Sequence, residues 1–576
     1  MRILSKKYLR VLLYLALAIS GLFWYRRLTM YAHPVDDAKD QDTKKQLAKT
    51  WLQTNNLEHW SGSKIFVVNV GRKKCYHVGK LLERCFIEYE MAPHTAKHAE
   101  RKLISKDLRG SYGFNWFGVS EYVFYDTLSI ESLSSTDEEV YSQLVAVHSI
   151  SNKKTLNAFE WIDNVFVEAV RILPNLSIDN YIISNLDILF GEDCVDPRPG
   201  WQLNKSWSFS KGRFPSFLSY KYLDHTEKED YTKQLQIRRD GKLKIVQLAD
   251  LHFSVGKGEC EDEFPASDNC EADPKTLRFI EGILDIEEPD LVVFTGDQIM
   301  GQRCVQDSTS ALLKVLAPVI ERKIPWALIW GNHDHEGSLD RWKLSEFTAA
   351  LPYSLFSMSA RDTNDNSFGV GNYILQLQGS TEEKATITLY FFDSHSYSRS
   401  GKIYPGYDWI KEAQWEYMRE RYDNEYSKHI AKDAHLSMAF FHIPIPEYLS
   451  FQSKKNPNEQ NPKVGTFKEG VTAPKYNSGG IFTLDYLGVD ATSCGHDHCN
   501  DYCILDDSSS RKIWLCFGGG SGEGGYAGYG GTERRIRIYE FDTKERAIYT
   551  WKRLNGSLKE KFDYQPIVSG GVPNFE

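Results

Sequence analysis

The sequence has little spare positive charge. Its 69 Lys and Arg residues are outnumbered by 78 Asp and Glu residues, which gives a formal net charge of −9 at pH 7. A protein that binds nucleic acid along the phosphate backbone needs a basic surface, so this balance disfavours nucleic acid as a partner. Apolar residues are not scarce, because 41% are hydrophobic and 13% aromatic, which excludes wholesale disorder. The 576 residues allow about three domains, or two with insertions.

A membrane signal is confined to the N-terminus, where Val11 to Tyr25 contains no charged residue. As a helix these fifteen residues span about 22 Å, short of the ~30 Å hydrocarbon core, but basic and aromatic residues flank them. No small-x-small cleavage site follows before Arg26, which favours a signal anchor in residues 1–30 over a cleaved signal peptide. The preceding basic residues predict a single-pass membrane protein with a cytosolic N-terminus and a body in the lumen of the secretory pathway.

Cysteine spacing gives a second indication of that compartment. Cys75 and Cys85 lie ten residues apart, as do Cys260 and Cys270, which is typical of local disulfides in an oxidising lumen. A glycoprotein is predicted from three sequons, which begin at Asn175, Asn204 and Asn555.

Four further cysteines admit two interpretations. Cys494, Cys499, Cys503 and Cys516 could form a structural zinc site, but their spacing is irregular for one. Cys503 and Cys516 flank an expected hairpin, so a disulfide between them is favoured over zinc.

The chain after the anchor divides into three predicted segments. Residues 31–58 are polar and charged and are expected to form a stalk. Residues 59–225 contain short β-branched and aromatic runs between turn signals, which predicts a strand-rich accessory domain. In residues 235–576 apolar strands alternate with amphipathic helices, the pattern of an α/β fold with buried sheets. Its first strands are expected at 243–250, 290–297 and 325–334.

Polar side chains that can bind metal follow nearly every apolar strand of the last segment. Because carboxyl ends of strands gather ligands at one edge of a sheet, five separated peptides are expected to converge on one crevice. Carboxylate and amide oxygens with imidazole nitrogens suit Mn, Fe or Zn ions. The candidate ligands are Asp250, His252, Asp297, Asn332, His442, His496 and His498.

This order of motifs (D-x-H, GD, GNHD, a lone His and GHxH) resembles the calcineurin-like metallophosphoesterases. The resemblance implies a β-sandwich flanked by helices over residues ~235–550, with two divalent or trivalent metal ions. It assigns one ion to Asp250, His252 and His498, with Asp297 bridging to the other. The second ion would be held by the remaining candidates, Asn332, His442 and His496.

The resemblance also implies roles for the two residues after Asn332. His333 would lie beside the leaving-group oxygen as a general acid, and Asp334 would orient it. The alternative is that His333 is a structural histidine near the metals.

Longer segments, such as IPWALIWGNHDHE and the glycine-rich GGGSGEGGYAGYGG, resemble the purple-acid-phosphatase-29 type of plants and the fungal dosage-dependent cell-cycle-regulator phosphatases. One departure concerns the tyrosine that binds the ferric ion in purple acid phosphatases, because this position is Met300. His252 would supply the missing ligand. The glycine-rich run lacks the Lys-Ser/Thr of a P-loop and is expected to form a wall of the active site.

These observations predict a two-metal phosphatase that hydrolyses phosphate monoesters with a metal-bound hydroxide, with phosphoproteins as one candidate substrate class. The alternatives are a phosphodiesterase or nuclease of the same fold and a membrane-tethered scaffold without activity. The presence of every expected ligand argues against the scaffold, and the acidic net charge against the nuclease. Asp393 and His395, which follow another strand, either touch the substrate or shape a loop.

Overall fold

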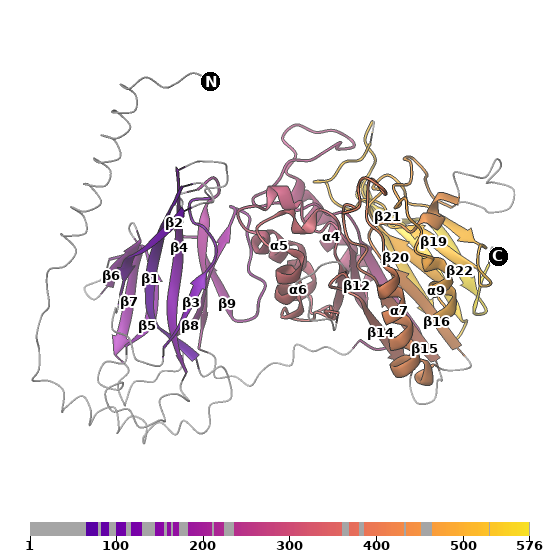
Figure 1. Cartoon of the computed structure of the whole chain (residues 1–576), viewed down its shortest axis with the longest axis horizontal. Coiled ribbons are helices and arrows are strands. Elements are labelled where there is room, and N and C mark those ends of the chain that lie inside the picture. The colour runs from indigo at the N-terminus through magenta and orange to yellow at the C-terminus, as the bar shows by residue number, and fades with distance from the viewer. Residues whose placement is uncertain are drawn as a thin grey trace, which may run out of the picture. The chain divides into compact units, whose positions relative to one another are not determined.

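A computed structural model describes most of the chain (Figure 1). The described residues are 65–78, 82–91, 99–110, 117–129, 145–154, 158–162, 165–171, 182–209, 212–223, 235–359, 368–379, 385–430, 434–450, 464–528 and 530–574.

The described chain before residue 224 is rich in strands, most of them in antiparallel pairs, which confirms the expected strand-rich region. The four-stranded sheet has the order β2-β1-β4-β3, and two three-stranded sheets have the orders β5-β7-β6 and β8-β10-β9. Their bounds are β1 Ile65–Val78, β2 Leu82–Glu90, β3 Glu100–Ile104, β4 Phe117–Ser129, β5 Val145–Ser151, β6 Ala158–Ile162, β7 Val165–Arg171, β8 Ile183–Phe190, β9 Trp201–Asn204 and β10 Ser216–Tyr222.

A seven-stranded mixed sheet begins the second region, with the order β13-β12-β11-β20-β21-β22-β23. β11, β12 and β13 are parallel, and β20 joins β11 in the antiparallel sense. All five residues of β12 are buried, as expected for a continuous apolar strand between two layers. The strands are β11 Lys242–Leu248, β12 Leu291–Thr295, β13 Trp326–Ile329, β20 Arg535–Asp542, β21 Ala547–Leu554, β22 Ser557–Ser569 and β23 Val572–Pro573.

A second, six-stranded sheet has the order β14-β15-β16-β17-β19-β18. Its β15, β16, β17 and β19 run parallel to one another, so their carboxyl ends lie at one edge. The strands are β14 Tyr373–Gln378, β15 Ala385–Phe391, β16 Ala434–Phe440, β17 Ala491–Cys494, β18 Cys503–Asp506 and β19 Ile513–Phe517.

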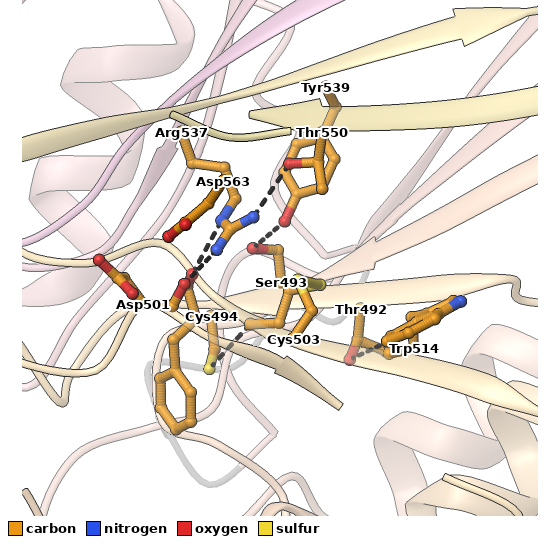
Figure 2. The surroundings of a disulfide bond; sticks show 12 residues. Thr492, Ser493, Cys494, Asp501, Cys503, Trp514, Arg537, Tyr539, Thr550 and Asp563 are labelled. Atoms are coloured by element: carbon orange, nitrogen blue, oxygen red, sulfur yellow. Dashed lines mark hydrogen bonds between the residues drawn. A yellow bond between two sulfur atoms is a disulfide. The ribbon is translucent and has the colours of Figure 1, made fainter. Parts of the chain in front are cut away.

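The two sheets face each other and are joined by buried polar contacts (Figure 2). Tyr539 of β20 donates its hydroxyl to Ser493 Oγ of β17 at 2.8 Å, and Arg537 Nε donates to the Phe517 carbonyl of β19 at 2.9 Å. On β11, Gln247 accepts from the Ser493 hydroxyl at 2.7 Å. The expected β-sandwich is therefore present, and the site loops are supplied by both of its sheets.

Helices cover the outer faces of the sandwich. The carboxyl end of α4 is fixed to the seven-stranded sheet, because Glu287 accepts from the Trp551 indole of β21 at 2.9 Å. On the other side, the Tyr390 hydroxyl of β15 donates at 3.2 Å to the Leu487 carbonyl, which follows α9. The longer helices are α4 Ala272–Glu287, α5 Ser308–Glu321, α6 Arg341–Ala349, α7 Glu412–Arg421 and α9 Gly480–Tyr486.

The single-pass membrane prediction needs correction. Among the residues that the structure describes, no helix combines the length and the apolar character needed to cross a bilayer, and on that finding the prediction is wrong. The span from which it was inferred, Val11 to Tyr25, lies outside those residues.

Cysteine pairing follows the short spacings in the sequence. Disulfides join Cys75 to Cys85 and Cys260 to Cys270. A third disulfide joins Cys503 of β18 to Cys516 of β19, directly opposite each other in register. The zinc alternative for this cluster is therefore not realised, because these two sulfurs are bonded to each other.

Candidate metal centre

Five loops from the two sheets meet at one edge of the sandwich. β11, β12 and β13 of the seven-stranded sheet lead into the loops that carry Asp250 and His252, Asp297, and Asn332. β16 and β17 of the six-stranded sheet lead into the loops that carry the other three candidate ligands. All seven side chains are buried, with exposed fractions of 7% or less for the residues Asp250, His252, Asp297, Asn332, His442, His496 and His498.

One half of the cluster joins the first D-x-H motif to the last histidine. His252 Nε2 lies 3.1 Å from His498 Nε2, and the latter nitrogen is 3.6 Å from Asp250 Oδ1. The ligand atoms of these three residues all lie within 4.8 Å of one another. These three side chains are therefore close enough together to bind one cation.

The other half is centred on His442. Its Nε2 lies 3.1 Å from Asn332 Oδ1 and 3.3 Å from Asp297 Oδ2. The same carboxylate oxygen of Asp297 is 3.8 Å from His252 Nε2 in the first half. Asp297 thus lies between the two groups, where the resemblance places a bridging ligand.

His496 completes the second group. Its ring lies 5.1 Å from the His442 ring, centroid to centroid, and its backbone N–H donates to Asp250 Oδ1 at 3.0 Å. Its Nε2 atom is buried and has no hydrogen-bond partner among the described residues. A buried nitrogen left unpaired is costly, and a metal ion at this position would satisfy it.

The backbone at four ligand positions adopts the left-handed region, which is rare for residues with a side chain. The φ angles are 54° at Asp250, 53° at His252, 52° at Asp297 and 75° at His496. Each residue follows the end of a strand, and the turn directs its side chain into the cluster. Such strain concentrates at functional sites, where the surrounding structure maintains it.

Two motif glycines are required by the space that the ligands occupy. A Cβ on Gly296 would lie 2.3 Å from His442 Nδ1, and Gly296 has a φ of +94°. A Cβ on Gly331 would lie 2.1 Å from Asp297 Oδ1. The glycines of the GD and GNH motifs therefore let these ligands approach closely.

Burial makes three imidazoles suitable as metal ligands. It lowers the pKa of His252 and His496 well below the ordinary value and that of His498 to about 3, so these rings are neutral. A neutral imidazole offers the lone pair that a metal ion requires.

The charges at the centre of the cluster are coupled. Burial raises the pKa of the Asp250 carboxyl well above its ordinary value. Burial also opposes ionisation of Asp297, but the neighbouring His442 holds the pKa of Asp297 well below its ordinary value. In turn, burial opposes protonation of His442, but the Asp297 carboxylate raises the pKa of His442 to about 9. Without metal ions, protons would compensate the buried carboxylates. Two metal ions would take the place of those protons.

The position of Asp334 differs from the expectation. Its carboxylate accepts hydrogen bonds from three backbone amides, those of Gly331 at 2.7 Å, Asp297 at 3.0 Å and Ile299 at 3.1 Å. It therefore clamps the GD loop to the GNHD loop and does not orient the ring of His333.

Glu336 makes the contact that was expected of Asp334. Its Oε2 lies 2.7 Å from Nδ1 of His333, and the His333 ring is 5.5 Å from the His252 ring, centroid to centroid. The His333 side chain is 24% exposed, so it is open to an incoming substrate. Glu336 was not found from the sequence, although its spacing of three from His333 was the available signal.

Aromatic residues support two of the ligands. The Tyr526 ring stacks on the His498 ring with centroids 3.9 Å apart, and the Tyr526 carbonyl lies 2.9 Å from His498 Nδ1. The glycine-rich segment is thereby a wall of the site, as expected. The Tyr407 and His496 rings are perpendicular with centroids 4.2 Å apart, a contact that no motif had indicated.

Comparison with known proteins agrees with this geometry. Residues 243–500 match the family model described as calcineurin-like phosphoesterase. "Phosphatase DCR2" of Saccharomyces cerevisiae is 50% identical over 584 residues, with 99% of each chain covered. "Probable inactive purple acid phosphatase 29" of Arabidopsis thaliana is 35% identical, covering 58% of this chain and 88% of that protein. "Probable inactive purple acid phosphatase 28" of the same plant is 34% identical, covering 58% and 85%.

These matches identify a phosphoesterase hydrolase. The β-sandwich agrees with them, because a buried cluster of carboxylates and histidines lies at its strand ends. The chain belongs to the calcineurin-like phosphoesterase family. Membership implies a site for two metal ions, and the cluster described above fits it in residue type, burial and spacing.

Proposed function

We propose that the chain is a two-metal phosphatase that hydrolyses phosphate monoesters, phosphoproteins among them. The observation that carries the proposal is the convergence of all seven candidate ligands beside an imidazole that is paired with a carboxylate. One ion would be held by Asp250, His252 and His498, and the other by the remaining three, Asn332, His442 and His496. Asp297 would bridge the two.

Two ions at such a site would neutralise phosphate oxygens and make a hydroxide available near neutral pH. Protonation of the leaving group and positioning of the loops depend on side chains of the protein. His333 donates a proton from Nε2 to the leaving oxygen, while Glu336 binds Nδ1 and stabilises the imidazolium. The backbone N–H of His333 donates to Asp297 Oδ1 at 2.8 Å, which fixes the acid relative to the bridging ligand. Asp334 keeps both loops in register through its three amide contacts.

A phosphodiesterase or nuclease remains the second candidate, because the same ligands serve diester hydrolysis. The net charge of −9 argues against long nucleic acid substrates. The choice of metal is a separate question, and the mixed oxygen and nitrogen donor set accepts Mn, Fe or Zn.

The test is a metal-reconstituted assay of the full chain. Stripped protein is loaded in turn with Mn, Fe or Zn and assayed with phenyl phosphate, bis(4-nitrophenyl) phosphate and a phosphoserine peptide. Turnover of the monoester and the peptide well above that of the diester supports the proposal. Preference for the diester supports the second candidate, and absence of turnover with every metal refutes both.

A further inference from the structure

The long loop between β15 and α7 is fixed at its base to the GNHD loop. Arg341 donates through Nη2 to the Gly331 carbonyl at 2.6 Å and to the His395 carbonyl at 3.0 Å. Gly331 directly precedes the candidate ligand Asn332. Arg341 is 3% exposed and paired with Asp393, so this anchor is buried. Asp393 therefore shapes the loop, one of its two expected roles.

Two tyrosines of this loop lie beside the metal cluster. Tyr397 forms a β-bridge with Tyr407, and their rings stack with centroids 5.4 Å apart. The backbone N–H of Ser398 donates to the Gly406 carbonyl at 2.9 Å, which closes the turn between the two tyrosines. The Tyr407 ring in turn contacts the ring of the candidate ligand His496. The position of the Tyr397 ring is therefore fixed relative to the cluster.

The hydroxyl of Tyr397 faces the candidate ligands. Burial raises the pKa of this phenol, the carboxylates of Glu336 and Asp297 raise it further, and the Asn332 side chain opposes them. A hydroxyl responds to all three of these groups only when it is directed toward them. At neutral pH the phenol keeps its proton and can donate a hydrogen bond. Tyr397 is nevertheless 49% exposed, so a substrate can reach it.

The phosphoryl group of a bound ester needs donors of this kind. It carries negative charge on its non-bridging oxygens, whereas His333 would serve only the leaving oxygen. A phosphoryl oxygen that is withdrawn from water needs a hydrogen-bond donor, and a donor fixed in advance binds it without reorganisation. Glu336 pairs with His333 and also lies close enough to affect the pKa of Tyr397. The phenol is therefore on the side of the cluster where the ester would bind.

We propose that Tyr397 is a further catalytic residue, whose hydroxyl donates a hydrogen bond to a non-bridging oxygen of the phosphoryl group. The inference rests on the proposed phosphatase function and adds a phosphate-binding side chain to it. Every phosphate monoester has this oxygen, so loss of the hydroxyl should affect all monoesters alike, whatever their leaving group. A group that assisted only the leaving oxygen would affect mainly esters with poor leaving groups.

The test is Tyr397→Phe in the reconstituted full chain, because phenylalanine keeps the ring that stacks on Tyr407 and removes only the hydroxyl. The measurements are kcat/KM on butyl phosphate and on 4-nitrophenyl phosphate, and the affinity for inorganic phosphate by calorimetric titration. Tyr397→Phe should lower kcat/KM about 5- to 30-fold on both esters, as expected for a partly exposed hydrogen bond to a charged group. Phosphate affinity should fall in the same sense, with the metal content unchanged.

Tyr404→Phe is the matched control. Tyr404 belongs to the same loop, but its ring packs against those of Trp409 and Tyr476. Removal of its hydroxyl should leave kcat/KM and the phosphate affinity within about twofold of the wild-type values.

Two results would overturn the inference alone. One is a Tyr397→Phe variant whose kcat/KM and phosphate affinity both stay within about twofold of the wild type. The other is a loss confined to butyl phosphate, which would place the hydroxyl at the leaving oxygen. Lack of turnover of any monoester by the wild type would instead refute the proposed function, and the inference with it.

Discussion

Replacing Glu336 with glutamine should slow the hydrolysis of esters with poor leaving groups. Glutamine keeps the length of the side chain and an oxygen that accepts from Nδ1 of His333, so the ring stays in place. Only the negative charge is lost. The imidazolium that protonates a leaving alcohol then lacks its counter-charge, and proton donation becomes less favourable.

The expected loss of kcat in Glu336→Gln can be estimated from the contact between Glu336 Oε2 and His333 Nδ1. A hydrogen bond to a charged group contributes about 1.5–3 kcal/mol. The two atoms are 2.7 Å apart, but the side chains are 24% and 21% exposed, so solvent weakens the interaction. A loss of about 1–2 kcal/mol corresponds to a roughly 5- to 30-fold lower kcat.

The assay measures kcat on an alkyl phosphate and on 4-nitrophenyl phosphate, whose leaving group needs little protonation. Glu336→Gln should lower the first about 5- to 30-fold and the second less than about threefold. Glu346→Gln, at an exposed acid on α6, controls for removal of a nearby charge. Equal losses on both substrates, or none, would refute the argument that His333 is an acid supported by Glu336.

Three further predictions concern the metals and the stability of the fold. Asp297→Asn should leave at most one metal per chain by elemental analysis and lower turnover at least ~10²-fold, because the bridging charge is lost; two metals with near-normal activity would contradict its bridging position. Gly331→Ala should lower both the metal content and the melting temperature, because the added Cβ would lie 2.1 Å from Asp297 Oδ1. Gly401→Ala is the control, since its Cβ would have its nearest contact at 3.6 Å, and it should change neither quantity. If the two variants behave identically, the steric explanation is wrong. Burial alone would raise the pKa of Asp501, but the Lys552 ammonium, 2.9 Å from its carboxylate, helps hold that pKa at about 2, below the ordinary value of 3.8. The resulting stabilisation of about 2 kcal/mol is present above pH ~4 and lost as the pH falls toward 2. In urea unfolding, the stability difference between wild type and Asp501→Asn should therefore shrink between pH 5 and 3, and a constant difference would rule out this titration.

The sequence was sufficient to predict the strands and the side chains that gather after them. A short apolar run between turn residues, such as 290–297, is typical of a strand buried on both faces, and the observed β12 lies within that range. Each candidate ligand lies within a few residues of the end of its strand, so the order of residues along the chain was enough to place it at the carboxyl edge of its sheet. The same local spacing gave the pairing of Cys75 with Cys85.

Contacts between distant segments were decided only by the tertiary structure. Whether Asp334 or Glu336 reaches His333 depends on the turn after Asn332, because the amides of the GD loop compete for the Asp334 carboxylate. The approach of Tyr407 to His496 depends on the conformation of the long loop between β15 and α7, which residue spacing does not specify. Strand periodicity reports burial, which is a local property of the chain. Distances between side chains from different loops depend on turns and packing, which only the folded chain defines.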